Sequence, residues 1–170
     1  KVQNVTKAEV EKFYADMIDH NDPQPISYGL NSQLTKDENG KVVERVWKQG
    51  GMYGEAIDKI LYWLEKASEV ASPVQKPIID ALCEYYRSGN LRDFDKYNVL
   101  WVQDIESNID FVNGFIEDYG DPMGRKASWE ANVSLRSDEA TKRTQIISEN
   151  AQWFEDNAPI NPEYRKKEVK

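Results

Sequence analysis

The residues best suited to binding chemistry lie between positions 110 and 117. This segment reads Asp110-Phe-Val-Asn-Gly-Phe-Ile-Glu117 and sets carboxylate and amide side chains among large apolar ones. Its alternating pattern predicts a strand, which we expect Gly114 to interrupt. A purely structural strand would keep its polar groups solvated, so Asp110, Asn113 and Glu117 could instead line a cleft.

The chain contains one histidine and one cysteine, which limits the chemistry it can perform alone. Zinc sites draw on His and Cys, with carboxylates as supplements. We expect His20 to lie at the end of a helix, where a positive charge suits the dipole. We expect Cys83, on an apolar helix face, to be a buried and unreactive thiol. The sequence therefore predicts no catalytic residue and no metal ligand within this chain.

Other candidate sites carry weaker signals. Paired carboxylates are common in a chain with 30 acidic residues, so most should be solvated. A further possibility is that the chain is a zinc-independent enzyme that uses the acidic residues near Asp110 and Glu117. Glycines 50, 51 and 54 lack the spacing of a phosphate-binding loop. Four aromatic residues could stack a ligand, but their helical spacing is typical of a core: Tyr62, Trp63, Tyr85 and Tyr86.

The charge balance bears on partners and on location. The formal net charge is −8, the wrong sign for binding a phosphate backbone, so we expect no nucleic-acid partner. No apolar run approaches the roughly 20 residues that span a bilayer, so we expect no membrane partner. A lone cysteine is compatible with a reducing compartment. We expect the protein to be cytoplasmic. If the chain belongs to a longer protein, an exported or periplasmic location of that protein stays open.

Helical patterns dominate the first part of the chain. Thr6 and Glu9 form a capping box that predicts a helix over 6–19. Residues 26–47 indicate a loop of weak strand character around Asn39-Gly40. A second helix is predicted over 55–71. Two more should follow, one from Ser72-Pro73 to Gly89 and one that Asn90 caps.

The pattern changes beyond Asp104. Residues 109–115 and 128–135 alternate, which predicts a β-hairpin with a wide connection. A last helix should begin at Ser137 and end before Pro159. Because an isolated hairpin is marginal in water, either helices cover it or its partner strands are missing.

We therefore predict an α+β fold that is mainly helical, with several packed helices, a strand pair in the C-terminal half and a last helix. The chain should be a single domain or part of one. Its helical part is expected over about 1–104, the strand pair with the last helix over about 105–158, and a tail over 159–170.

The sequence resembles the dipeptidyl peptidase III family of zinc metallopeptidases, especially its bacterial branch. The likeness covers most of the chain and is carried by these motifs: Tyr28-Gly-Leu-Asn-Ser-Gln-Leu34, Gly50-Gly-Met-Tyr-Gly54, Tyr62-Trp-Leu-Glu-Lys-Ala67, Trp101-Val-Gln-Asp104, Asp110-Phe-Val-Asn-Gly-Phe-Ile-Glu117, Tyr119-Gly-Asp-Pro-Met-Gly124 and Ser128-Trp-Glu130. A block of this length is far more specific than one short motif.

The resemblance implies two lobes around a cleft and the removal of dipeptides from the N-termini of oligopeptides. It also implies zinc held by a His-Glu-x-x-Gly-His helix and a later Glu, both absent from this chain. We therefore expect an incomplete lobe that precedes the zinc-binding part. The parent protein would bind zinc and oligopeptide, and this segment would be inactive alone and would have the catalytic lobe of the same polypeptide as its partner.

The resemblance also suggests roles for single residues. Animal relatives carry Glu-Ser-Tyr-x-Gly-Phe-Ile-Glu here, and the first Glu and the Tyr help to hold the substrate N-terminus. Asp110 keeps that carboxylate, whereas Val112 replaces the Tyr. A carboxylate suits a substrate ammonium, since charge-assisted hydrogen bonds are roughly twice as strong as neutral ones. Asn113 could contact a peptide backbone; the alternative is that Asp110 and Asn113 are structural polar groups of the hairpin.

Two functions thus stand beside each other. The first is a non-catalytic segment of a dipeptidyl peptidase III-like zinc exopeptidase, forming part of the cleft wall with Asp110, Asn113, Gly114 and Glu117. The alternative is a stand-alone peptide-binding or scaffold protein related to that family, without hydrolase activity.

Overall fold

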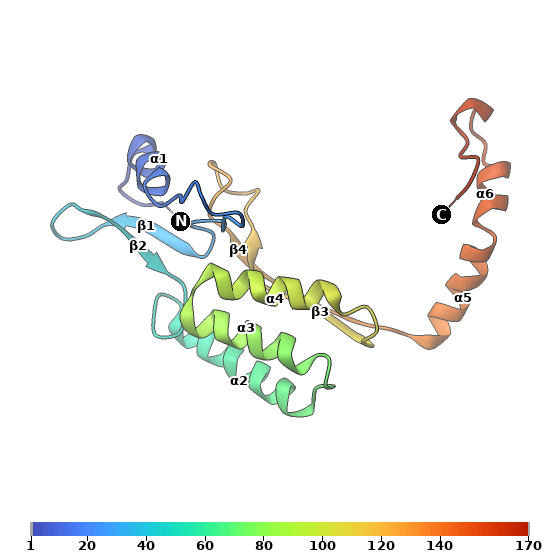
Figure 1. The fold of residues 1–170 in the computed structure, drawn as a ribbon, viewed down its shortest axis with the longest axis horizontal. Coiled ribbons are helices and arrows are strands. Elements are labelled where there is room, and N and C mark those ends of the chain that lie inside the picture. Colours follow the sequence, from blue (N-terminus) through green and yellow to red (C-terminus); the bar gives the residue numbers. More distant parts are fainter. Residues whose placement is uncertain (1, 170) are drawn as a thin grey trace. The chain divides into compact units, whose positions relative to one another are not determined.

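The computed structural model describes residues 2–169, which divide into two compact units. The first unit contains the chain up to Ser107 together with Phe111–Asn132, and the second contains Asn108–Asp110 together with the chain from Val133 onward. Figure 1 labels the elements of both. No helix within the described residues is long and apolar enough to cross a membrane.

The first helix, α1 (Lys7–Ala15), begins at the predicted capping box. The Thr6 side chain accepts from the Glu9 backbone N–H, and the Glu9 side chain accepts from the Thr6 backbone N–H. The helix ends four residues earlier than predicted. His20 therefore lies in an exposed turn and not at the helix end, which corrects our prediction for it.

A β-hairpin follows where we predicted a loop of weak strand character. β1 (Ser32–Lys36) pairs antiparallel with β2 (Val42–Val46), with Ser32 opposite Val46. Gly40 adopts φ +76°, and the Asp37 side chain accepts from two backbone N–H groups in the turn. The residues of the turn predict its conformation. The two strands are too short for an alternation of apolar and polar residues to predict them as strands.

Three helices pack side by side, as predicted: α2 (Gly54–Val70), α3 (Lys76–Ser88) and α4 (Leu91–Gln103) (Figure 1). Pro77 lies in the first turn of α3, and Gly89 ends that helix with φ +68°. The Asn90 side chain caps α4 by accepting from the Arg92 N–H. Their apolar faces form the main core, in which Leu82, Tyr85 and Tyr86 are almost fully buried.

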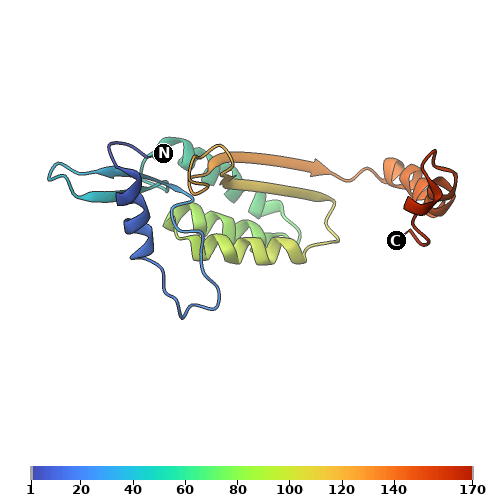
Figure 2. The same cartoon turned by 90° about the horizontal axis from the view of Figure 1, so that it is seen from above.

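Two strands cover this helical layer. β3 (Ile109–Glu117) pairs with β4 (Ser128–Leu135), and Figure 2 shows the parts of both strands that belong to the first unit beside its helices. Phe115 enters the core, and the Phe111 ring stacks with Tyr97 of α4 at 6.3 Å between centroids. β3 is continuous through Gly114, so the predicted interruption there is wrong.

The second unit holds the remaining helices. The predicted last helix is divided at Asn150 into α5 (Asp138–Glu149) and α6 (Ala151–Asn157). A short 3₁₀ turn, η1 (Pro162–Tyr164), follows, and the last described residues hydrogen-bond back to α6 through Gln152 and Glu155. The predicted α+β, mainly helical fold is confirmed.

Candidate functional site

Asn113 of β3 is held by a tyrosine from the helical layer. The Tyr86 hydroxyl donates a hydrogen bond to Asn113 Oδ1 and accepts one from Trp129 Nε1 at 2.8 Å. Tyr86 is fully buried, and this burial raises the pKa of its hydroxyl, which therefore stays a donor. One hydroxyl thus joins α3, β3 and β4 and fixes the position of Asn113.

Gly114 is explained by packing. A Cβ at this position would come within 3.0 Å of Phe94 Cε2, closer than ordinary van der Waals contact. The absence of a side chain lets β3 lie directly on α4. The structure thus gives Gly114 a role in placing its neighbours on the strand.

Glu117 lies beside a second carboxyl group. The adjacent Glu130 side chain raises the pKa of Glu117, chiefly through a hydrogen bond, and desolvation and the nearby Asp118 charge act in the same direction. Ser128 Oγ donates to the Glu117 carbonyl oxygen at 3.1 Å. The negative charges on these neighbouring side chains oppose the ionisation of Glu117.

The four predicted site residues fall in different units. Asn113, Gly114 and Glu117 belong to the first unit, whereas Asp110 belongs to the second and is exposed. Since neighbouring side chains on a strand point to opposite faces, Asn113 and Glu117 share a face with Phe115. On this face of β3, two of the predicted residues, Asn113 and Glu117, therefore lie on either side of the apolar Phe115.

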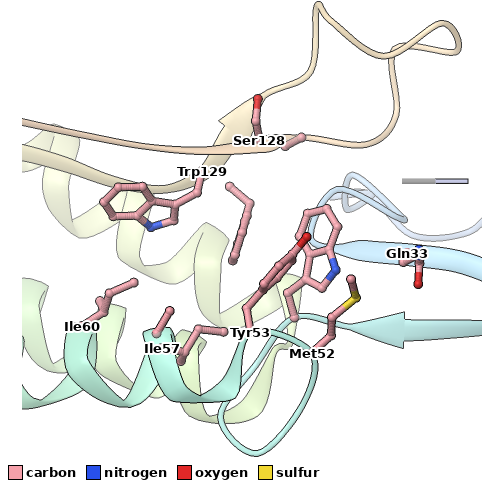
Figure 3. A pocket seen from close by; sticks show the side chains of 11 residues that line it. Gln33, Met52, Tyr53, Ile57, Ile60, Ser128 and Trp129 are labelled. Carbon is pink, nitrogen blue, oxygen red and sulfur yellow. The ribbon is translucent and has the colours of Figure 1, made fainter.

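That face borders a cavity of about 530 Å³ in the first unit. Trp129 of β4 lies on one side, and Ile57 and Ile60 of α2 lie on the other (Figure 3). Phe115 of β3 also lines the cavity. Figure 3 also shows Tyr53 and Met52 at the start of α2, beside Ile57. The cavity wall is mostly apolar, and every charged side chain of the described residues lies outside its lining.

Trp47 is a residue of this cavity that the sequence analysis did not identify. It lines the cavity, packs on Phe115 at 4.8 Å between ring centroids and is only 4% exposed. Its indole Nε1 makes no hydrogen bond to any residue in the described part of the chain. The only signal in the sequence was a tryptophan placed just before a glycine-rich turn, which does not reveal an unpaired donor.

A second polar cluster holds the loop between β3 and β4 against the N-terminal part of the first unit. The Lys126 ammonium is fully buried; it donates to the Tyr14 hydroxyl and, at 2.8 Å, to Ser32 Oγ. Glu44 Oε1 lies 3.6 Å from it, and the Tyr14 hydroxyl donates to the same oxygen at 2.7 Å. Burial lowers the pKa of Lys126 to about 8.

The residues that could hold a metal do not come together. Within residues 2–169, no three His, Cys, Asp or Glu side chains gather as metal ligands would, and His20 is exposed. Cys83 is buried, as predicted, and this burial raises its pKa to about 11. The described residues therefore do not fit a zinc site, and we derive no chemical step through one.

Comparison with known proteins identifies the family. The model described as peptidase family M49 matches residues 5–170. Nudix hydrolase 3 of Arabidopsis thaliana is 29% identical over 120 residues, covering 69% of this chain and 15% of that protein. Dipeptidyl peptidase 3 of Dictyostelium discoideum is 29% identical over 100 residues, covering 59% and 14%. The human enzyme of that name is 24% identical over 117 residues, covering 68% and 16%.

Solved structures share the fold. The dipeptidyl-peptidase III of Corallococcus sp. strain EGB superposes with a TM-score of 0.62 at 21% identity, over 98% of this chain and 30% of that one. The enzyme of Caldithrix abyssi gives a TM-score of 0.64 at 20% identity, over the same shares. This chain thus spans 14–16% of the curated relatives named above and 30% of each structural neighbour. Because the family model matches nearly its whole length, the chain belongs to peptidase family M49, the family of the dipeptidyl peptidase III metallopeptidases.

Proposed function

We propose that this chain is a non-catalytic part of a zinc-dependent dipeptidyl peptidase and that it supplies one wall of the peptide-binding cleft. The match to peptidase family M49 over residues 5–170 carries the proposal. Several relatives are named dipeptidyl peptidases, and the formal net charge of −8 suits a positively charged peptide terminus. Zinc would be held by residues outside those described, and the longer protein would be cytoplasmic.

In this proposal Asp110 binds the N-terminal ammonium of the peptide. The side chain is exposed, so a ligand can reach it. A hydrogen bond between two charged groups contributes about 1.5–3 kcal/mol, which exceeds that of a neutral pair.

Asn113 and Glu117 would bind the peptide backbone. Asn113 Oδ1 accepts from Tyr86, so the orientation of its amide is fixed and the amide N–H groups face away from that bond. The Glu117 carboxyl group, which lies beside Glu130, would accept from a backbone N–H of the peptide. Gly114 allows the strand to lie on Phe94 and holds both residues in place.

The substitution Asp110→Asn in the longer natural polypeptide tests this assignment. It removes the charge and keeps the shape, so we expect KM for a peptide with a free N-terminus to rise about tenfold or more, with kcat changed little. Asp16→Asn is the matched control, because Asp16 is an exposed partner of Lys12 on α1. An equal KM in both variants would show that Asp110 does not bind the peptide.

A further inference from the structure

Tyr86 lies at the centre of a short chain of hydrogen bonds that joins α3, β3 and β4. Trp129 Nε1 donates to the Tyr86 hydroxyl at 2.8 Å, and this hydroxyl donates to Asn113 Oδ1. Tyr86 itself is fully buried, among the residues of the main core. A core residue therefore holds a side chain that the proposed function places in the peptide-binding cleft.

The chemistry of these three groups determines which way the Asn113 amide points. An indole N–H can only donate, so the Trp129 indole takes a lone pair of the Tyr86 hydroxyl oxygen. Burial raises the pKa of Tyr86, so the hydroxyl keeps its proton, and a buried proton needs an acceptor. Asn113 Oδ1 is that acceptor. If the amide turned over, two N–H groups would meet one oxygen and the Tyr86 proton would lose the acceptor it has.

The amide nitrogen of Asn113 is therefore directed away from Tyr86. Within residues 2–169 this nitrogen makes no hydrogen bond, and Asn113 is only partly buried. An accessible N–H donor can bind an acceptor from outside the chain, such as a carbonyl oxygen of a peptide backbone. Because Tyr86 fixes the amide before a peptide arrives, binding does not have to restrict the rotation of the amide, which favours affinity.

We propose that Tyr86 is a positioning residue for peptide binding, which acts by holding the Asn113 amide so that its N–H groups face a carbonyl oxygen of the peptide. Tyr86 is fully buried and does not touch the peptide itself. This inference rests on the proposed function, in which Asn113 binds the peptide backbone. The alternative is that the hydrogen bond between Tyr86 and Asn113 only stabilises the packing of β3 on α3. The two roles differ in what the loss of one hydroxyl does to KM.

The test is Tyr86→Phe in the longer natural polypeptide, with a peptide that has a free N-terminus as substrate. This change keeps the ring and removes the hydroxyl, so we expect KM to rise about threefold to tenfold, as for the loss of one neutral hydrogen bond, with kcat changed little. Tyr85→Phe is the matched control and should leave KM unchanged, because Tyr85 is as deeply buried on α3 and lies outside this chain of hydrogen bonds. An equal KM in the two variants, even with a lower unfolding temperature for Tyr86→Phe, would overturn the proposal.

A double-mutant cycle shows whether Tyr86 acts through Asn113. In the Asn113→Ala variant the amide is absent, so the addition of Tyr86→Phe should raise KM no further. Effects of the two substitutions that multiply in the double variant would contradict the positioning role, because Tyr86 would then act on binding by another route.

A titration of the unaltered longer polypeptide with N-acetyl-glycyl-glycyl-glycinamide decides even if Tyr86→Phe does not fold. This probe has no side chains and a blocked N-terminus, so its binding reports backbone contacts and does not depend on Asp110. We expect a saturable downfield NMR shift of a side-chain amide proton of Asn113, which the Asn113→Ala variant assigns. An amide signal that does not move would overturn the proposal.

The two measurements separate this inference from the proposed function. A polypeptide whose Asn113 amide responds to the probe but that releases no dipeptides would contradict the proposed function alone. In that case the dissociation constant of the probe replaces KM in the comparison of the Tyr86→Phe and Tyr85→Phe variants. A polypeptide that releases dipeptides with an equal KM in these two variants would contradict the positioning role alone.

Discussion

Lys126 shows how one buried charge ties separate segments together. Its ammonium contacts the Tyr14 hydroxyl of α1 and Ser32 of β1, and it lies near Glu44 of β2. The guanidinium of the neighbouring Arg125 lies over the same tyrosine ring, 4.6 Å from its centroid. Because burial opposes the charged form, this cluster should respond to pH.

We predict that the free energy of unfolding rises between about pH 8 and pH 10. The pKa of Lys126 is lowered to about 8 in the folded chain, whereas an unfolded lysine titrates near 10.4. Over this interval the unfolded chain binds more protons, so stability increases with pH, by about 1–2 kcal/mol. Burial raises the pKa of Tyr14, which acts in the opposite direction only above about pH 10.

Urea unfolding at pH 8.0 and at pH 9.5 measures this effect. The variant Lys126→Met should lose the rise, whereas Lys12→Met, at a residue exposed on α1, should retain it. An identical pH dependence in both variants would show that Lys126 is not the responsible group.

For single residues, the sequence identifies the type of side chain at each position but not the residues that this side chain contacts. The burial of Cys83 followed from its apolar helix face, and that prediction is confirmed. The pairing of Asn113 with Tyr86 and the unpaired indole of Trp47 depend on contacts between residues 27 or more positions apart, which local patterns do not encode. Asp110, Asn113, Gly114 and Glu117 stay predictions as substrate-binding residues.

The packing of β3 on α4 depends on Gly114. The substitution Gly114→Ala should destabilise the first unit by about 1–3 kcal/mol, because its Cβ would lie 3.0 Å from the Phe94 ring. Gly120→Ala is the matched control, since a Cβ there meets no atom within 4 Å. Thermal unfolding of the two variants measures the difference, and equal midpoints would mean that the ring moves aside at no cost.

At the level of elements, the sequence indicated the helices better than the strands. The capping box at Thr6, Pro77 in the first turn of α3 and Gly89 after its last turn are local signals, and each is found in the structure. β1 and β2 are five residues each and are defined by their pairing with each other, which short-range alternation does not show. The sequence predicts a break at Gly114. The glycine is instead needed for the close approach of Phe94, which is a tertiary contact that a local pattern does not show.

The two units differ in how they are stabilised. The first has a core of aromatic and aliphatic residues, whereas none of the residues described in the second is buried. α5 is 12 residues long, and an isolated helix of that length is marginal in water. Large apolar side chains on these helices, such as Ile147 and Trp153, are more than half exposed.

We therefore predict unequal hydrogen exchange along the isolated 170-residue chain. Amides in the middle of α3 should exchange only through unfolding of the first unit, whereas those of α5 should exchange at least a hundredfold faster through local opening. Hydrogen–deuterium exchange followed by mass spectrometry compares the two helices directly. Similar protection in α3 and α5 would show that the second unit has a stability of its own.

At the scale of the whole molecule, we propose that this chain is part of a zinc-dependent dipeptidyl peptidase and that it is inactive alone. The most direct measurement is mass spectrometry of the products formed from a hexapeptide by the natural polypeptide that contains this chain. The account predicts successive release of dipeptides from a free N-terminus, loss of release with a chelator, recovery with zinc, and no release by residues 1–170 alone. Release of single amino acids, release unaffected by the chelator, or no cleavage by the longer polypeptide would contradict it.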